Sequence, residues 1–312
     1  MAGQATGSAA MPADWAPADR IRLIVPFAAG GGNDRAARLI APGLGAALGQ
    51  PVMVENHSGA SGTLGAGIVA RAAPDGTTLL VDGANQVTAP FLLRQAGLDY
   101  RDAFAPISRL VLTPLLLVLR AESRFDSLAA LLDRARMQPG RFSYASSGNA
   151  VANHVAAALL ASRAGVSVTH SPFRGGAPAL QAILSGEADF GFAILAAALA
   201  PLRQGRLRAL AISTAARSPV LPAVPTVAEQ GFPGYDQSSW SGLFGPAGLS
   251  AAAIGALNAA CREALGTAEM QRRLAASGAA SILGTPEEFR AFLQRERAAM
   301  QVLVGTARIR AE

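Results

Sequence analysis

Short apolar runs alternate along this chain with segments in which apolar residues recur every three or four positions. The first run, residues 21–25, stops at a proline and is followed by three glycines at 30–32 and a segment of helical period at 36–48. A short apolar run fits either a buried strand or a buried helix, and the abrupt stop favours a strand. We therefore predict a strand, a glycine loop and a helix, with Asn33 or Asp34 as the helix N-cap.

The same order of strand, small-residue loop and helix recurs down the chain, which predicts an α/β protein with right-handed βαβ units and parallel sheets. Further strands are expected at 51–55, 77–82, 142–145, 166–169, 189–193, 207–212 and 240–246, and further helices at 128–137, 151–164, 178–185, 251–265, 268–276 and 286–306.

Three features refine this outline. Residues 107–112 and 115–119 form two strand-like pieces on either side of Pro114, and we place a crossing between domains there. Thr285 and Glu288 have the spacing of a capping box, so the last helix is expected to begin between them. Because 312 residues exceed what one hydrophobic core usually supports, two domains are expected.

Composition narrows the functional classes. The formal net charge of +6 comes entirely from arginine, and the arginines are spread without a basic run, so we expect no nucleic-acid partner. A mild positive field still favours small anions. The single cysteine, Cys261, excludes an intramolecular disulfide and a cysteine-cluster metal site, and its apolar neighbours at helical spacing predict a buried thiol. No apolar run reaches the ~18 residues that a membrane span needs.

The glycine loops raise the question of nucleotide binding, and the hydroxyl groups raise that of hydrolysis. A phosphate loop needs a Gly-Lys-Ser/Thr sequence, but this chain has no lysine, and the glycines at 30–32 and 59–65 miss the dinucleotide spacing. Ser146 and Ser147 follow a predicted strand, but they lack the flanking glycines of a nucleophile elbow. No pair of histidines has the helical spacing of a zinc hydrolase, so we expect no metal and no cofactor.

Four predicted strand ends instead lead into loops of Gly, Ser, Asn and Ala. A loop of this kind at the start of a helix offers free backbone N–H groups and the positive end of the helix dipole, which together attract an anion. Open α/β sheets bind ligands at the carboxyl ends of their strands, so two facing sheets would bring these loops to one cleft. Such a cleft has the donors of a binding site and few groups that could catalyse a reaction.

Seven segments, in this order, resemble the substrate-binding proteins of tripartite tricarboxylate transporters, the Bug or TctC family. The segments are 21–34 (IRLIVPFAAGGGND), 48–56 (LGQPVMVEN), 59–62 (GASG), 70–76 (ARAAPDG), 144–149 (YASSGN), 171–175 (SPFRG) and 240–246 (WSGLFGP). The resemblance runs from about Arg20 to the C-terminus. It implies a two-domain periplasmic-binding-protein clamshell, each domain a mainly parallel sheet flanked by helices, that closes on a small carboxylated molecule.

The resemblance also implies boundaries and site residues. The boundaries are an unstructured leader at 1–18, domain 1 at 19–113 plus 242–312, and domain 2 at 114–241. One ligand carboxylate is expected at Phe27, Ala28, Gly31 and Asn33 together with Ser146, Ser147, Gly148 and Asn149. The rest of the site is expected to comprise Gly62, Thr63, Ala84, Asn85, His154, Arg174, Gly175 and Ala193.

Two departures from the family pattern bear on function. Many relatives have an acidic residue after the strand that ends here at Phe192, where this chain has Ala193 and Ile194. A ligand with an amine would lose a counter-charge there, so we hypothesise an aliphatic or aromatic mono- or dicarboxylate. The family is periplasmic, but no export signal is visible, so the sequence represents either the mature form or a protein used in the cytoplasm.

The resemblance implies a monomeric receptor, without catalysis, that delivers its ligand to the membrane components of a tripartite tricarboxylate transporter. Two alternatives remain open from the sequence. One is a ligand sensor for a membrane kinase. The other is a cleft enzyme that uses Ser146 or Ser147 as a nucleophile on a carboxylated substrate.

Overall fold

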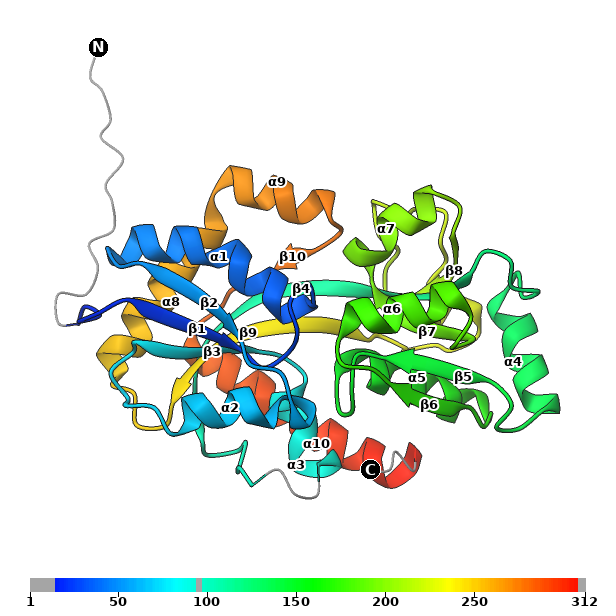
Figure 1. Cartoon of the computed structure of the whole chain (residues 1–312), viewed down its shortest axis with the longest axis horizontal. Helices are drawn as coiled ribbons and strands as arrows, with labels where there is room; N and C mark the ends of the chain where they lie inside the picture. The colour runs from blue at the N-terminus through cyan, green and yellow to red at the C-terminus, as the bar shows by residue number, and fades with distance from the viewer. Residues whose placement is uncertain (1–14, 94–96, 308–312) are drawn as a thin grey trace, which may run out of the picture.

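Two sheets flanked by helices, side by side along the longest axis of the molecule, form this α/β protein (Figure 1). The computed structural model describes residues 15–93 and 97–307. Most of the predicted leader, residues 1–14, lies outside the described residues. Trp15 packs against the hydrophobic core of the first sheet.

The first sheet has a parallel centre. Strands β1 (Ile21–Val25), β2 (Val52–Asn56) and β3 (Thr78–Asp82) run parallel in the order β2-β1-β3, and β9 (Ser238–Pro246) lies antiparallel beside β3. One face packs against α1 (Gly32–Leu48) and α8 (Ala251–Gly266), and the other packs against α2 (Thr63–Ala70), α3 (Asn85–Leu92) and α10 (Pro286–Ala307). We call this sheet with its helices the first lobe.

The second sheet repeats the plan. Strands β7 (Phe190–Ile194), β5 (Ser143–Ser146) and β6 (Thr169–Pro172) run parallel, and β8 (Leu207–Ile212) pairs antiparallel with β4. One face packs against α4 (Leu128–Met137) and α5 (Ala152–Ala164), and the other packs against α6 (Gly176–Ser185) and α7 (Leu195–Arg203). We call this sheet with its helices the second lobe.

Strand β4 (Phe104–Arg120) belongs to both sheets, and with β9 it runs from one lobe to the other (Figure 1). The prediction of two pieces separated by Pro114 was wrong, because the strand continues through the proline. Pro114 is the last residue of β4 to align with β9, and from Leu115 onward β4 pairs with β7. A proline cannot donate a ladder hydrogen bond, and it stands here where the strand exchanges one partner for another.

Most predicted elements are present, with some shifted boundaries. The strand predicted at 166–169 was misplaced, because β6 begins at Thr169 and pairs with β5 through the residues that had been assigned to a loop. The sequence also gave no sign of helix α3 or of the two-residue strand β10 (Ala280–Ser281). The helices α8, α9 (Ala268–Ala276) and α10 lie where they were predicted.

The predicted capping box and the predicted buried thiol are both confirmed. The Thr285 N–H donates to Glu288 Oε2 at 2.8 Å, and the Glu288 N–H donates to Thr285 Oγ1 at 3.1 Å. Cys261 is fully buried between α8 and α1, and burial raises the pKa of its thiol to about 12. The cysteine is therefore an inert part of the core.

Helices α1 and α8 pack very closely because glycine lies at their contact. A Cβ atom on Gly43 of α1 would lie 2.7 Å from the Cβ of Ala264 on α8, which is too close for two carbon atoms. Glycine thus lets the two helix backbones approach, and this contact fixes the position of α1 against the first sheet.

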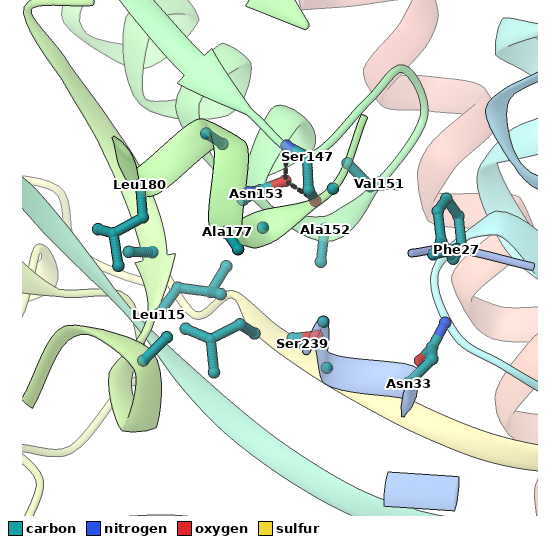
Figure 2. Close-up of a pocket in the computed structure, with 18 of the residues that line it drawn as sticks. Phe27, Asn33, Leu115, Ser147, Val151, Ala152, Asn153, Ala177, Leu180 and Ser239 are labelled. Carbon is teal, nitrogen blue, oxygen red and sulfur yellow. Dashed lines mark hydrogen bonds between the residues drawn. The ribbon is translucent and has the colours of Figure 1, made fainter. Parts of the chain in front are cut away.

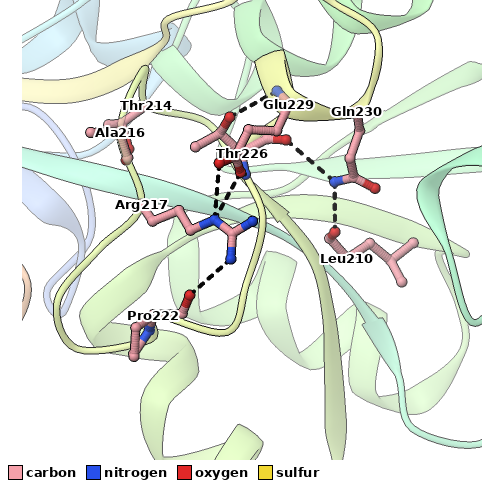
Figure 3. Close-up of polar contacts among 8 residues, drawn as sticks. All are labelled: Leu210, Thr214, Ala216, Arg217, Pro222, Thr226, Glu229 and Gln230. Atoms are coloured by element: carbon pink, nitrogen blue, oxygen red, sulfur yellow. Dashed lines mark hydrogen bonds and ion pairs between the residues drawn. The ribbon is translucent and has the colours of Figure 1, made fainter.

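The segment that returns the chain from β8 to β9 is ordered by side-chain hydrogen bonds (Figure 3). Arg217 Nε lies 2.9 Å from Glu229 Oε2, and the same carboxylate accepts the Thr226 N–H at 2.7 Å. The Thr226 backbone N–H and the Arg217 guanidinium hold the pKa of Glu229 below its usual range. Within this segment the chain forms the 3₁₀ turn η2 (Ala228–Gln230).

Candidate functional site

A cavity of about 190 Å³ lies between the two lobes and draws its walls from both. The first lobe contributes the loop between β1 and α1 and the start of α3. The second lobe contributes the residues after β5, the start of α6 and the end of β7. Each of these segments follows the carboxyl end of a strand, which is where open α/β sheets bind ligands.

The first wall is the glycine loop and the first turn of α1. The predicted N-cap was wrong, because the helix begins at Gly32 and its N-cap is Gly31, so Asn33 and Asp34 lie inside the first turn. The N–H groups of a first turn have no carbonyl partner within their own helix, and Gly31, Gly32 and Asn33 all line the cavity. The positive end of the α1 dipole therefore faces the cavity.

Asp34 holds this loop in shape, a role that the sequence analysis missed. Its buried carboxylate accepts the Gly30 N–H at 2.8 Å, Arg38 Nε at 3.0 Å and Asn56 Nδ2 at 3.0 Å. Burial alone would raise its pKa, but the hydrogen bonds from Arg38, Gly30 and Asn56 outweigh burial and hold the pKa below its usual range. Asp34 is thus an anion in the folded protein and takes one of the loop N–H groups away from any ligand.

The second wall follows β5. Ser147 lines the cavity, and both its N–H and its hydroxyl donate to Asn153 Oδ1, at 3.3 and 3.1 Å (Figure 2). Because the Asn153 oxygen is occupied twice, its amide N–H groups are candidate donors to a ligand. Asn153 lies in the first turn of α5, so a second helix N-terminus faces the cavity.

Ser146 points away from the cavity and is fully buried. Its Oγ lies 2.6 Å from His170 Nε2 and 2.8 Å from the Gly148 carbonyl oxygen, so the hydroxyl links β6 to the loop after β5. A serine and a histidine at hydrogen-bond distance are a nucleophile pair only if substrate can reach the serine. Here no substrate can reach Ser146, and its contacts are those of a loop support.

His154 and His170 form a stack beneath the same loop. Their ring centroids lie 4.0 Å apart with 8° between the ring planes, and Tyr144 stacks on His170 at 4.9 Å. Burial lowers the pKa of His154 to about 3 and that of His170 to about 4, so both rings are neutral near pH 7. The Nδ1 atom of His154 accepts the Ala150 N–H at 3.1 Å.

The third helix start belongs to α6. Gly175 is its N-cap, and Gly175, Gly176 and Ala177 line the cavity. A Cβ atom on Gly175 would lie 3.4 Å from the Cβ of Ala28, so the two lobes nearly touch at this edge. Gly175 has φ = 126° and ψ = 172°, a conformation that essentially only glycine adopts.

The floor of the cavity holds a buried acid. Asp82 Oδ1 accepts the Gly83 N–H at 2.8 Å and Asn33 Nδ2 at 3.3 Å, and Oδ2 accepts Gln86 Nε2 at 3.0 Å. Burial raises the pKa of Asp82 to about 6, although these three hydrogen bonds work against the shift. Ser241 Oγ donates to Asn33 Oδ1 at 3.0 Å, so the Asn33 side chain is fixed from two sides.

The predicted site residues therefore divide into two groups. Those that line the cavity are Phe27, Ala28, Gly31, Asn33, Ala84, Asn85, Ser147, Gly175 and Ala193. Those that the structure places outside its lining are Gly62, Thr63, Ser146, Gly148, Asn149, His154 and Arg174.

Several residues of the second group stand directly behind the lining. A Cβ atom on Gly62 would lie 2.9 Å from Asn85 Nδ2 and 3.0 Å from the Phe27 ring. Thr63 Oγ1 donates to the Ala60 carbonyl oxygen at 2.9 Å, and Arg174 is an exposed side chain. Lining residues that the sequence analysis missed include Leu115, Asn153, Leu180, Ile183, Phe192 and Trp240. Of these six residues, only Asn153 could have been predicted from the sequence, because it is a polar residue at the start of a predicted helix.

Metal sites and membrane-spanning helices would point to other functions. Among residues 15–93 and 97–307, no three His, Cys, Asp or Glu side chains gather as a metal ion would require. None of the helices within those ranges is both long enough and apolar enough to cross a membrane.

Two lobes joined by crossing strands, with a cavity between them that the N-termini of α1, α5 and α6 face, define a two-lobed binding protein of the periplasmic-binding-protein class. The chain belongs to the TctC family, described as the tripartite tricarboxylate transporter family receptor, whose model matches residues 36–307. It is thus a member of a family of receptors and not of enzymes, so the alternative of a cleft enzyme with a serine nucleophile has no support from the family.

Three solved structures share this fold. The periplasmic binding protein BugD is 29% identical with a TM-score of 0.88, over 95% of this chain and 100% of that chain. Rpa4515 of R. palustris, solved with adipate, is 32% identical with a TM-score of 0.90, over 94% and 99%. MatC of Rhodopseudomonas palustris, solved with bound malate, is 33% identical with a TM-score of 0.87, over 92% and 99%. The predicted clamshell fold is thereby confirmed.

Proposed function

We propose that this protein is an extracytoplasmic solute receptor that binds a small carboxylate and delivers it to a tripartite tricarboxylate transporter. Family membership supports the receptor role. The adipate and malate in two structural neighbours support a carboxylate as the ligand. The name of BugD, a periplasmic binding protein, supports the extracytoplasmic location, and the transporter is the partner that the family description implies.

The observation that carries the proposal is the convergence of the first turns of α1, α5 and α6 on one cavity. Each first turn offers N–H donors without a partner in its helix, and each helix dipole favours negative charge by ~0.3–1 kcal/mol. Hydrogen bonds to a carboxylate are about twice as strong as those between neutral groups. Three helix starts therefore bind a carboxylate without needing a cationic side chain.

The proposed binding residues are the lining residues of the glycine loop, Ser147 with Asn153, and the Gly175 turn. The proposed moving bodies are residues 19–113 plus 242–312 and residues 114–241. Ligand that contacts both bodies stabilises their closed arrangement, because only contacts made across the cleft differ between the open and closed states. We propose that the receptor acts as a monomer.

A thermal-shift screen of the full chain over small carboxylates tests the proposal. A ligand at 100 times its Kd stabilises the native state by ~2.7 kcal/mol, so at least one carboxylate should raise the melting temperature by several degrees. The amide of the same compound, which has the same shape without the charge, is the matched control. If no carboxylate raises the melting temperature, or if the amide raises it equally, the proposal is wrong.

Replacement of Ser147 by leucine tests the location of the site. The larger side chain would enter the cavity and break the bond to Asn153, so we expect a loss of carboxylate binding of more than about 100-fold, measured by isothermal titration calorimetry. Ser162→Leu, an equal change at an exposed position of α5, is the control for effects on folding. Unchanged affinity in Ser147→Leu would place the ligand elsewhere.

A further inference from the structure

We infer that the ligand carries one carboxylate and an apolar tail of aliphatic or aromatic carbon, so that it is a monocarboxylate and not a dicarboxylate. This inference rests on the proposed receptor function and narrows its ligand class. It follows from how polar and apolar groups are divided between the two ends of the cavity.

One end of the cavity holds the donors. In Figure 2, Phe27 and Asn33 lie at one side, and Ser147 and Asn153 lie above the space between that side and the centre. The start of α6 belongs to the same end, because Gly175 approaches Ala28 of the glycine loop. The loop before α1 and the N-cap of α6 therefore lie close together, and a single carboxylate bound beside them can accept hydrogen bonds from both lobes.

The other end of the cavity is lined by carbon. Leu115 and Leu180 lie at the side opposite Phe27 and Asn33 (Figure 2), and the cavity also contacts Ile183 and Phe192. Ile183 and Phe192 are only 2% and 1% exposed, so packing fixes them in place. None of these side chains has a hydrogen-bond donor or acceptor, and such a surface gains free energy by covering apolar ligand area.

The side chains of Leu115, Leu180, Ile183 and Phe192 offer a second carboxylate no hydrogen bond. The titratable side chains of the cavity lining are Asp82 and Arg35. Asp82 lies beside Asn33, whose Nδ2 donates to it at 3.3 Å, and its carboxyl offers no cation to an anion anywhere in the cavity. Arg35 Nε donates to the Gly30 carbonyl oxygen at 3.0 Å, which ties its exposed guanidinium to the glycine loop. Burial of an ionised carboxylate without a partner is strongly unfavourable, so the arrangement selects against dicarboxylates.

Isothermal titration calorimetry of the full chain with butanoate, hexanoate, octanoate, adipate and hexan-1-ol tests the inference. We expect affinity to rise about fourfold per methylene from butanoate until the tail fills the cavity. Adipate, which differs from hexanoate by a second carboxylate, should bind at least about 100-fold more weakly. Hexan-1-ol should bind more weakly than hexanoate because it lacks the charge.

The outcomes separate this inference from the proposed function. Adipate binding as tightly as hexanoate, or no gain with chain length, would overturn the inference and leave a carboxylate receptor. Hexan-1-ol binding as tightly as hexanoate would overturn both. If another small carboxylate binds when none of these five compounds does, a ligand with one carboxylate and an apolar tail would support the inference, and a ligand with a second carboxylate would overturn it.

A change of specificity gives a second test. Leu180→Arg places a cation at the apolar end, and we expect hexanoate to bind at least tenfold more weakly and adipate at least tenfold more tightly. Gln181→Arg, the same change at the neighbouring exposed position of α6, should alter neither affinity. Equal effects of the two variants would overturn the inference.

If Leu180→Arg does not fold, Leu180→Ala replaces it. This shortened side chain should weaken octanoate binding more than butanoate binding, because only the longer tail reaches it. Equal weakening of the two ligands would overturn the inference.

Discussion

Asp82 is an acid placed where its charged form is disfavoured. It is fully buried in the cavity floor, and burial raises its pKa to about 6 from an ordinary value of 3.8. Between these two values the folded state binds a proton that the unfolded state has released. Ionisation of Asp82 therefore destabilises the fold. This loss of stability is absent below about pH 3.8, grows as the pH rises, and reaches its full size above about pH 6.

Replacement of Asp82 by asparagine should remove this cost. The amide can keep the hydrogen bonds from Gly83 and Asn33, and Gln86 can turn its own amide to present oxygen. We expect Asp82→Asn to raise the free energy of unfolding by up to about 3 kcal/mol at pH 8, with the gain shrinking as pH falls from 6 to 4. Urea unfolding at pH 8, 6 and 4 measures the difference.

Asp34 provides a control, because its ionisation has the opposite effect on the free energy of unfolding. Its pKa is lowered in the fold, so its charge stabilises the protein above pH 3.8 and this stabilisation is lost as pH falls below that value. Asp34→Asn should lower the free energy of unfolding at pH 8 and have less effect in acid. A gain in Asp82→Asn that does not change with pH would contradict the interpretation.

The positions of the individual predicted residues show which binding-site residues can be inferred from a sequence. Glycine, serine and asparagine in loops after strands drew attention to Asn33, Asn85 and Ser147, all of which line the cavity. The choice between Ser146 and Ser147 depended on which face of β5 each side chain takes, and alternation along a strand sends neighbours to opposite sides. Leu115 and Ile183 carried no signal, because an apolar residue of the cavity looks like any residue of the core.

At the scale of elements, the site depends on where α1 stands, and α1 is located by its contact with α8. Gly43→Ala would force the helices apart at Ala264 and should destabilise the protein by ~1–3 kcal/mol. Since the start of α1 forms a wall of the cavity, carboxylate affinity should also fall. Chemical unfolding and calorimetry measure the two effects.

Gly255→Ala is the matched control for this helix contact. It is also a helical glycine, on α8, but a Cβ atom there would meet no atom within 4 Å. We expect a gain of roughly 0.5–1 kcal/mol, because alanine loses less conformational entropy than glycine when a helix forms. Destabilisation by both changes would show that the close contact is not the cause.

The errors in predicted elements share a physical reason. Strand β6 was placed three residues early because its sequence, Thr-His-Ser-Pro, has no apolar residue, and pairing with β5 decides its position. Strand β4 was divided at Pro114 because a proline usually ends a strand, and its neighbours at that point could not be known from sequence. Tertiary pairing overrides local preference in both cases.

At the scale of the whole molecule, the two lobes meet around the cavity with little spare room. Gly175 faces Ala28 across the cleft, and the Thr88 hydroxyl of α3 donates a hydrogen bond to the Ala150 carbonyl oxygen of the second lobe. Contacts of this kind set how closely the lobes approach, and ligand binding should depend on them.

Replacement of Gly175 by valine should hold the lobes apart at this edge. The side chain would extend beyond a Cβ position already 3.4 Å from Ala28, and a backbone that favours glycine adds strain. We expect carboxylate affinity to fall at least tenfold while the protein remains folded, as calorimetry and circular dichroism would measure. Gly165→Ala, a positive-φ glycine at the end of α5 with open space around it, controls for the backbone strain.

The control should lose a little stability and keep its affinity. Equal loss of affinity in both variants would mean that strain, and not separation of the lobes, weakens binding.

The fold class and the two-sheet plan could be predicted at this scale because strand and helix alternate in order. The close approach of the lobes could not, because it depends on pairs of residues 62 and 147 positions apart, Thr88 with Ala150 and Ala28 with Gly175.

The path of the chain through β4 and β9 also has a consequence for how the protein is made. Every strand and helix that belongs only to the second lobe lies between residues 121 and 237, one continuous stretch of the chain. The first lobe needs β9 beside β3, and its core includes residues of α8 and α9 such as Leu257 and Leu274. A ribosome adds the 39 residues from 238 to 276 in roughly 2–8 s. During that interval the second lobe is fully synthesised, while the lobe that was begun first still lacks the end of α9.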